Sequence, residues 1–332
     1  MSALLQSIAD VSEELAAASM ALEVTQGLSS QPKQLPSKFF YDAEGSRLFE
    51  EICRQPEYDL MRTEIEILER FGADMAQAIG PDVRIVEFGS GSGIKTRLLL
   101  SHLINPASYT PIEISLDALH ESLKNLKREF PLLPVAAFAA DFTQPFHLPH
   151  TNARRTLLFF PGSTIGNFDT PNALRILRNV HAAVGRDGGA IIGIDLRKGV
   201  AETEAAYNDA AGVTARFTLN MLAHINRELG ADFDLSRFAH RARYDATVGR
   251  IETHLISLAE QVVNVAGATF PFELNEAMLV EYSHKYTLEE FEMLGWRAGF
   301  RIDKVWTDDR QRFAVVNLVS TPVQDSHLGN RR

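Results

Sequence analysis

The chain has 332 residues, of which 45% are hydrophobic and 23% are charged, a composition typical of a folded globular protein. Its formal net charge of −10 argues against a nucleic-acid partner, because the phosphates would repel it. The single cysteine, Cys53, excludes an intrachain disulfide and a cysteine-based zinc site, and we expect no bound metal.

Membrane and export signals are also missing from the sequence. No run approaches 18 apolar residues, so we expect no transmembrane helix and no membrane partner. The first residues do not follow the basic, apolar and small-residue order of a signal peptide. We therefore expect a cytoplasmic protein. We also expect a monomer.

The beginning of the chain predicts a helix and then an irregular, aromatic-rich segment. Residues 1–28 carry apolar side chains at roughly helical spacing. Residues 30–36 contain two prolines and indicate a loop, and residues 39–42 begin an aromatic-rich patch.

From about residue 60 to residue 196, short β-rich runs alternate with helical patterns. This alternation predicts a parallel, doubly wound sheet. Helices are expected around residues 92–104, 115–129 and 171–184. The expected strands are residues 84–88, 109–114, 135–140, 156–160 and 190–196.

The pattern changes after residue 200 and becomes regular again near the end. Residues 217–229 carry apolar side chains on one helical face, and residues 250–264 indicate strand. A helix at 288–298 precedes two strand-like runs, 301–306 and 313–320, which suit an antiparallel hairpin. A parallel α/β sheet with a terminal hairpin is typical of class I methyltransferases, whose fold is Rossmann-like.

These patterns predict two domains. Residues 61–198 and 287–322 are expected to form a domain with the class I methyltransferase fold. Residues 1–60 and 199–286 are expected to form a smaller α+β substrate-binding domain. Residues 323–332 are expected to be a disordered tail.

A glycine-rich turn at residues 89–93 is the most informative motif of the chain. Glycine lets the backbone turn tightly and approach a ligand, where any Cβ would collide. The helix pattern that follows offers free backbone N–H groups to that ligand. A strand, glycine turn and helix in this order are typical of a site for an adenosine-containing cofactor.

Residues at the ends of the expected strands narrow the choice of cofactor. Glu113 can accept hydrogen bonds from both ribose hydroxyls, and Asp141 can accept one from an adenine amino group. The ring of Phe142 can stack on adenine, and Lys95 can reach a ligand carboxylate. Together they favour S-adenosylmethionine over NAD, although strand-end acids are often helix caps and such lysines are often solvated.

Three further stretches carry polar side chains suited to a small polar substrate. They are residues 160–168, 206–214 and 281–286. Each also has a purely structural interpretation: a capped turn for Asn167, a packed ring for Tyr207, and a solvated strand for Glu281 and Ser283.

Ordered matches along most of the chain indicate a family. The chain resembles the L-histidine Nα-methyltransferases of the ergothioneine pathway, which use S-adenosylmethionine to trimethylate the histidine α-amino group and give hercynine. The resemblance runs from about residue 31 to residue 320. It is carried by LPSKFFYD (35–42), PEY (56–58), RTE (62–64), EFGSG (87–91), GSTIGN (162–167), DAAGVT (209–214) and NREL (226–229).

The resemblance implies roles for the cofactor site and the reacting amine. It places Tyr41 and the backbone of Gly162 beside the amine, as the candidate catalytic groups. S-adenosylhomocysteine would be the second product. The cofactor-binding residues that it implies are Gly89, Lys95, Glu113, Asp141 and Phe142.

The resemblance also implies how the amino acid is held. Asn167 and Tyr207 would hold the α-carboxylate, since an amide and a phenol both donate hydrogen bonds. Tyr58, Glu281 and Ser283 would surround the imidazole ring, where Glu281 accepts an imidazole N–H.

Two positions depart from the family pattern. Thr253 stands in the expected imidazole pocket where family members often carry methionine, which leaves the preference for histidine open. Glu113 replaces an aspartate and lengthens the reach to the ribose. Retention of both Glu281 and Ser283 still favours a ring that carries N–H groups.

Three alternatives remain open from the sequence. One is an α-N-methyltransferase for another aromatic amino acid such as tryptophan, which Thr253 alone supports. Another is a non-catalytic S-adenosylmethionine-binding protein. A dehydrogenase is disfavoured by the expected hairpin and by the lack of a recognisable His–Asp pair.

Overall fold

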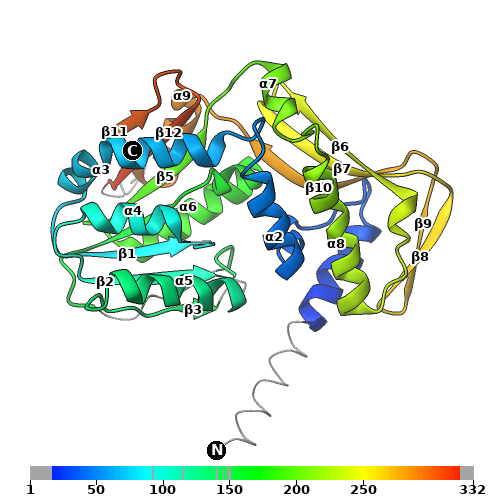
Figure 1. Cartoon of the computed structure of the whole chain (residues 1–332), viewed down its shortest axis with the longest axis horizontal. Helices are drawn as coiled ribbons and strands as arrows, with labels where there is room; N and C mark the ends of the chain where they lie inside the picture. Colours follow the sequence, from blue (N-terminus) through cyan, green and yellow to red (C-terminus); the bar gives the residue numbers. More distant parts are fainter. Residues whose placement is uncertain are drawn as a thin grey trace, which may run out of the picture. The chain divides into compact units, whose positions relative to one another are not determined.

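The computed structural model describes residues 17–91, 93–113, 116–139, 141–144, 146, 148 and 151–321. The chain splits into two compact units (Figure 1). The larger unit comprises Leu60–Lys198 and His284–Arg332, and the smaller unit comprises Met1–Asp59 and Gly199–Ser283. The tail expected at 323–332 and the first half of the helix expected at 1–28 lie outside the described residues.

A seven-stranded sheet is the framework of the larger unit, in the order β11-β12-β5-β4-β1-β2-β3. The pairs β1–β2, β1–β4, β2–β3 and β4–β5 are parallel, and β12 runs antiparallel to both β5 and β11. This mostly parallel sheet with a terminal hairpin confirms the predicted class I methyltransferase fold. The strands are β1 (Val83–Phe88), β2 (Ser108–Glu113), β3 (Phe138–Ala139), β4 (Arg155–Phe160), β5 (Gly189–Asp195), β11 (Phe300–Thr307) and β12 (Phe313–Ser320).

Helices cover both faces of this sheet, which is why its central strands β1 and β5 are buried along their whole length. On one face, Ile85 packs in a core with side chains of α3 and α4. On the other, Val86 and Phe88 pack with side chains of α6 and α9. The helices are α3 (Leu60–Ile79), α4 (Ile94–His102), α5 (Leu116–Glu129), α6 (Thr170–Val184) and α9 (Leu288–Arg297) (Figure 1).

The third strand is shorter than predicted. The sequence favours strand over residues 135–140, but only Phe138–Ala139 pair continuously with β2. Val135 forms an isolated bridge with Tyr109. The strand lies at the edge of the sheet, where a short length limits pairing with other chains.

The smaller unit combines helices with two antiparallel sheets. A three-stranded sheet has the order β10-β7-β6, and β8 pairs with β9. The single run expected at 250–264 is in fact two strands, because the chain bends at residues 258–259. Residues 17–29 are helical, and the other elements are η1 (Ser37–Phe40), α2 (Ala43–Ile52), α7 (Val200–Ala205), α8 (Val213–Leu229), η3 (Leu235–Arg237), β6 (Phe238–Asp245), β7 (Arg250–Ser257), β8 (Gln261–Val265), β9 (Ala268–Phe272) and β10 (Ala277–His284).

Asp195, at the end of β5, fixes two segments of the larger unit that lead to the smaller one. Its carboxylate pairs with Lys198, 2.9 Å away, and with Lys285, 2.8 Å away. Leu196 and Tyr286 form a parallel bridge beside these pairs. All three charged side chains are almost fully buried, so the pairing holds the segments in defined positions.

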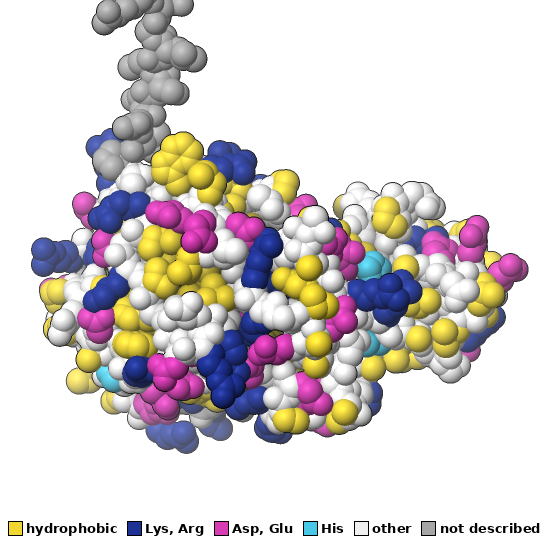
Figure 2. Space-filling model, turned by 90° about the horizontal axis from the view of Figure 1, so that it is seen from above, with side chains coloured by type: hydrophobic (Ala, Val, Ile, Leu, Met, Phe, Trp, Pro, Cys, Tyr) yellow, Lys and Arg dark blue, Asp and Glu magenta, His cyan; other side chains and the backbone are white. Residues whose placement is uncertain are grey.

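The surface carries charges of both signs. On the face drawn in Figure 2, basic and acidic side chains of the described residues are interspersed with apolar ones. Of the helices in the described part of the chain, none combines the length and the apolar character that crossing a bilayer requires.

Candidate functional site

The strand order of the larger unit reverses beside β1, since β2 lies on one side of it and β4 on the other. At such a point the loops that follow neighbouring strands, here β1 and β4, diverge. In open α/β sheets, ligands bind between such loops. Gly89 follows β1, and Gly162 follows β4 shortly before η2 (Thr164–Asn167). Two predicted site residues therefore lie where the fold favours a ligand.

The glycine turn after β1 has the features of a cradle. Gly89 has φ +66°, a conformation that L side chains rarely adopt, and a Cβ built on it meets no atom of the described residues within 4 Å, its chain neighbours apart. In the described part of the chain the buried hydroxyl of Ser90 has no hydrogen-bond partner. Open space beside an unsatisfied buried donor fits a polar ligand at this turn.

Glu113 lies at the end of β2 and faces the same turn. Its Oε2 accepts a hydrogen bond from the backbone N–H of Gly91 at 3.3 Å, and the residue is buried. A carboxylate held there has further lone pairs that can accept from ribose hydroxyls.

Asp141 and Phe142 follow β3 and also take part in local contacts. The Asp141 carboxylate accepts hydrogen bonds from Thr143, from its N–H at 2.9 Å and from its hydroxyl at 2.6 Å. The ring of Phe142 stacks on that of Phe88, with centroids 4.7 Å apart. Both residues therefore have a structural role, and their contact with adenine stays a prediction.

Lys95, in the first turn of α4, pairs with a carboxylate that sequence reasoning missed. Its Nζ lies 2.8 Å from Oε2 of Glu64, whose side chain is fully buried. Glu64 also accepts a hydrogen bond from the N–H of Gly162. A signal was present, because Glu64 falls in phase with the buried residues Leu60 and Leu68 of α3.

Glu87, the residue before Phe88 at the end of β1, was also not singled out. It accepts hydrogen bonds from the hydroxyls of Thr96 and Tyr109. Burial raises the pKa of Glu87 to about 7, although these hydrogen bonds and Lys95 oppose the shift. A buried carboxyl whose pKa is raised to about 7 thus lies two residues before Gly89.

In the smaller unit the structure brings five predicted substrate residues together. The hydroxyls of Tyr207 and Ser283 are 2.7 Å apart, and the rings of Tyr58 and Tyr207 meet edge to face with centroids 6.2 Å apart. The Thr253 hydroxyl donates to Glu281 at 3.4 Å. Burial raises the pKa of Tyr58 well above its usual value, as do Tyr207 and Glu281 nearby, so its phenol keeps its proton as a donor.

The backbone of Tyr207 is held by a histidine. Nε2 of His240 donates to the Tyr207 carbonyl at 2.8 Å, and Nδ1 lies 3.0 Å from the hydroxyl of Thr218. Burial lowers the pKa of His240, which favours the neutral imidazole. The ring therefore ties β6, which carries His240, to both Tyr207 and α8.

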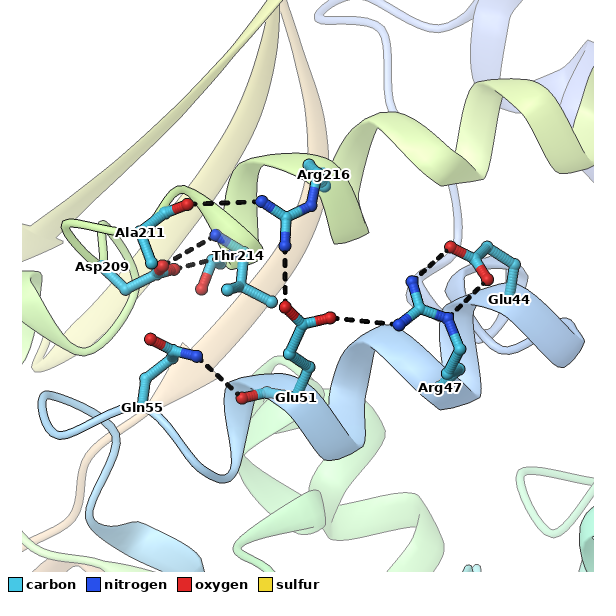
Figure 3. A network of polar contacts seen from close by, with 9 residues as sticks. Glu44, Arg47, Glu51, Gln55, Asp209, Ala211, Thr214 and Arg216 are labelled. Carbon is cyan, nitrogen blue, oxygen red and sulfur yellow. Dashed lines mark hydrogen bonds and ion pairs between the residues drawn. The ribbon is translucent and has the colours of Figure 1, made fainter.

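The loop after Tyr207 is anchored by charged groups (Figure 3). Asp209 accepts hydrogen bonds from the N–H groups of Val213 and Thr214, both at 2.7 Å, at the start of α8. Arg216 donates to the Ala211 carbonyl at 3.3 Å and to Glu51 of α2 at 2.9 Å. The loop is thus fixed to α8 directly and to α2 through one arginine.

Tyr41 packs in an aromatic cluster of the smaller unit. Its ring lies 5.7 Å from those of Phe49 and Phe217. Asp42, the next residue, caps α2 through Gly45 N and pairs with Arg227 of α8. These contacts set the position of Tyr41 within the unit.

The two remaining predicted residues, Gly162 and Asn167, belong to the larger unit. The segment between them is fixed by His284, whose Nδ1 donates to the Gly166 carbonyl at 3.0 Å. The structure therefore places five of the predicted substrate residues in the smaller unit and Asn167 in the larger unit. That all these residues bind one and the same substrate stays a prediction.

Comparison with known proteins identifies the family. A sequence model described as histidine-specific methyltransferase, SAM-dependent, matches residues 20–320. The chain belongs to this family. The resemblance predicted from the motifs is thereby confirmed, and members of the family depend on S-adenosylmethionine.

Three relatives show the extent of the similarity. The histidine N-alpha-methyltransferase of Mycolicibacterium smegmatis is 37% identical over 306 residues, which cover 90% of this chain and 94% of the relative. That of Mycobacterium tuberculosis is 38% identical over 300 residues, 88% of this chain and 92% of the relative. Ergothioneine biosynthesis protein 1 of Schizosaccharomyces pombe is 27% identical, over 81% of this chain and 36% of that protein.

The raised pKa of Glu87 predicts a pH-dependent stability. The folded state favours the protonated carboxyl, so the stability that Glu87 contributes is complete below its unfolded pKa and is lost as the pH rises towards 7. We expect Glu87→Gln to gain about 3 kcal/mol of unfolding free energy relative to the wild type between pH 4.5 and pH 8. Urea unfolding across this range measures the difference.

The matched control is Glu66→Gln on the exposed face of α3. Its free-energy difference from the wild type is expected to stay within about 0.5 kcal/mol at every pH. A constant difference between Glu87→Gln and the wild type would contradict the assignment.

Proposed function

We propose that this protein transfers three methyl groups from S-adenosylmethionine to the α-amino group of L-histidine. The product is hercynine, and the reaction is the first step of ergothioneine biosynthesis. The observation that carries the proposal is the family match over residues 20–320, with histidine N-alpha-methyltransferases 37% and 38% identical along most of the chain.

The larger unit is proposed to bind the cofactor. Gly89 and the turn that follows would admit it closely, Glu113 would accept its ribose hydroxyls, and Lys95 would meet its carboxylate. Asp141 and Phe142 would hold the adenine. The open space at Gly89 and the unsatisfied Ser90 hydroxyl support the fit, since both favour a polar ligand at the turn.

The smaller unit, together with Asn167, is proposed to bind the amino acid. Asn167 and Tyr207 would donate to the α-carboxylate, while Tyr58, Glu281 and Ser283 would surround the imidazole. The short distance between the Tyr207 and Ser283 hydroxyls supports this arrangement, because it places the proposed carboxylate and ring contacts side by side.

The proposed mechanism depends on positioning. When bound, S-adenosylmethionine supplies an electrophilic methyl group on a sulfonium, which is a good leaving group. The residues of the chain anchor the carboxylate and the ring, so that the α-amine is directed to the methyl group in line. The amine must lose a proton before each of the three transfers, and we propose Tyr41 or a water molecule beside the Gly162 backbone as the acceptor.

Thr253 bears on the choice of amino acid. It is fully buried, and its hydroxyl contacts the carboxylate of Glu281. A hydroxyl in this place keeps the carboxylate in a polar setting, which favours a ring with N–H groups over an apolar one.

The cytoplasmic location and the monomeric state stay predictions.

The direct test is mass spectrometry of histidine incubated with the purified protein and S-adenosylmethionine. Product masses that correspond to one, two and three added methyl groups are expected, with the third predominant at long times. A protein that binds S-adenosylmethionine but leaves histidine unmodified would overturn the proposal and favour a non-catalytic binding protein.

Replacement of the carboxylate donors is expected to weaken substrate binding. Tyr207→Phe and Asn167→Ala each remove one hydrogen bond to a charged group, which corresponds to a rise of about 10- to 100-fold in KM for histidine. Steady-state kinetics at saturating cofactor measure the effect. Tyr244→Phe, which removes a phenol outside the proposed site, serves as the control, and unchanged KM values in both site variants would refute the roles.

Glu281→Ala is expected to erode the preference for histidine. Without the carboxylate, an imidazole N–H loses its acceptor, so the ratio of kcat/KM for histidine over tryptophan should fall at least about tenfold. A competition assay with both amino acids gives this ratio directly. The matched control is Glu273→Ala at an exposed position, and the ring-pocket assignment fails if Glu281→Ala discriminates as the wild type does.

A further inference from the structure

Glu64 is a buried charged group of the larger unit to which the proposed reaction assigns no role. It lies in α3, and its side chain is fully buried. We infer that Glu64 is a positioning residue that holds Lys95 and the Gly162 peptide in place for the cofactor and the amine. This inference rests on the proposed function.

One carboxylate joins two loops of the site. Its Oε2 lies 2.8 Å from Nζ of Lys95, which follows β1 and the glycine turn. The same oxygen accepts a hydrogen bond from the Gly162 N–H at 2.8 Å, after β4, and Oε1 is 3.1 Å from that nitrogen. Glu64 thus links the segment after β1 to the segment after β4. These two strands are neighbours at the point where the strand order reverses.

The surrounding backbone makes room for these contacts. A Cβ on Gly193 of β5 would lie 2.2 Å from Oε1 of Glu64, closer than atoms can approach. A Cβ on Gly162 would lie 3.1 Å from Nζ of Lys95. Glycine at both positions therefore permits the three groups to pack without displacement.

The contacts have different consequences for the two partners. An ammonium has three N–H donors, so Lys95 can bind Glu64 and still donate to the carboxylate of the cofactor. Gly162 has a single N–H, which Glu64 occupies. The group that Gly162 offers to the substrate amine is therefore its carbonyl oxygen, an acceptor, with its direction set by the fixed peptide before it.

Replacement of Glu64 by glutamine keeps the size of the side chain and changes only its charge and its hydrogen bonding. The amide has nearly the same shape, but it carries one oxygen acceptor and one NH2 group, which is a donor. Its single oxygen can take the place of Oε2 and accept from both Lys95 and Gly162, but the second contact of the Gly162 N–H, to Oε1, is replaced by an NH2 group that cannot accept. The charge that neutralises Lys95 is lost as well.

The test is a double-mutant cycle on Glu64→Gln and Lys95→Met. Isothermal titration with S-adenosylhomocysteine gives the Kd, and kinetics with histidine give kcat and KM. We expect Glu64→Gln to raise the Kd about tenfold and to lower kcat about tenfold. In the Lys95→Met background, Glu64→Gln should leave the Kd unchanged while it still lowers kcat through Gly162.

Two further variants keep the result decisive. Glu66→Gln, on the exposed face of the same helix, is expected to match the wild type in Kd and kcat. Glu64→Asp keeps the charge on a shorter side chain, so its Kd should lie between those of the wild type and Glu64→Gln, and it replaces Glu64→Gln should that variant fail to fold.

The outcomes distinguish this inference from the proposed function. Wild-type Kd and kcat in folded Glu64→Gln, or a Kd effect that adds in full to that of Lys95→Met, overturns the positioning role. A wild-type protein that binds S-adenosylhomocysteine without methylating histidine overturns the proposed function, while the Kd cycle still decides whether Glu64 acts through Lys95.

Discussion

The constraint on which the larger unit depends is the burial of its parallel strands on both faces. The strands are buried through most of their length, so their polar groups can reach a ligand only where the strands end. Gly89, Glu113 and Gly162 all occupy such positions. The reversal of strand order beside β1 then separates the loops after β1 and β4, and the candidate cofactor residues follow from this topology.

Three buried carboxylates make hydrogen bonds or ion pairs near the carboxyl ends of these strands. Glu64 joins Lys95 to the Gly162 peptide, Glu87 accepts from two hydroxyls beside the glycine turn, and Asp195 pairs with Lys198 and Lys285 at the end of β5. Such groups are costly to bury, and their net contribution to stability is small. What they provide is a fixed direction for each backbone segment, which a reaction governed by alignment requires.

The sequence predicted the framework well and the supporting contacts poorly, for physical reasons. Strand–helix alternation, the glycine turn and the terminal hairpin are local patterns, and each lies within a few residues of its predicted place. The length of β3 depends on its position at the sheet edge, which no local pattern encodes. Glu64 was missed although it lies in phase with the buried face of α3, because its partners Lys95 and Gly162 are distant in sequence. The grouping of Tyr58, Tyr207, Glu281 and Ser283 came from the family resemblance, since their separate segments carry no common period.

In the proposed site, the contact between the Tyr207 and Ser283 hydroxyls would link the two ends of the bound amino acid. Each hydroxyl has one proton, and only one of the two can donate within the pair. In the proposed site Tyr207 donates to the α-carboxylate, so Ser283 must donate to Tyr207. The Ser283 oxygen would then accept from the ring, and because Glu281 is proposed to accept from the ring as well, the two contacts together suit an imidazolium, which has two N–H groups. A side chain without an N–H cannot make these contacts, whereas an indole offers its single N–H at a different distance from the α-carbon. In the proposed site the pair would therefore favour histidine through the direction of its hydrogen bonds.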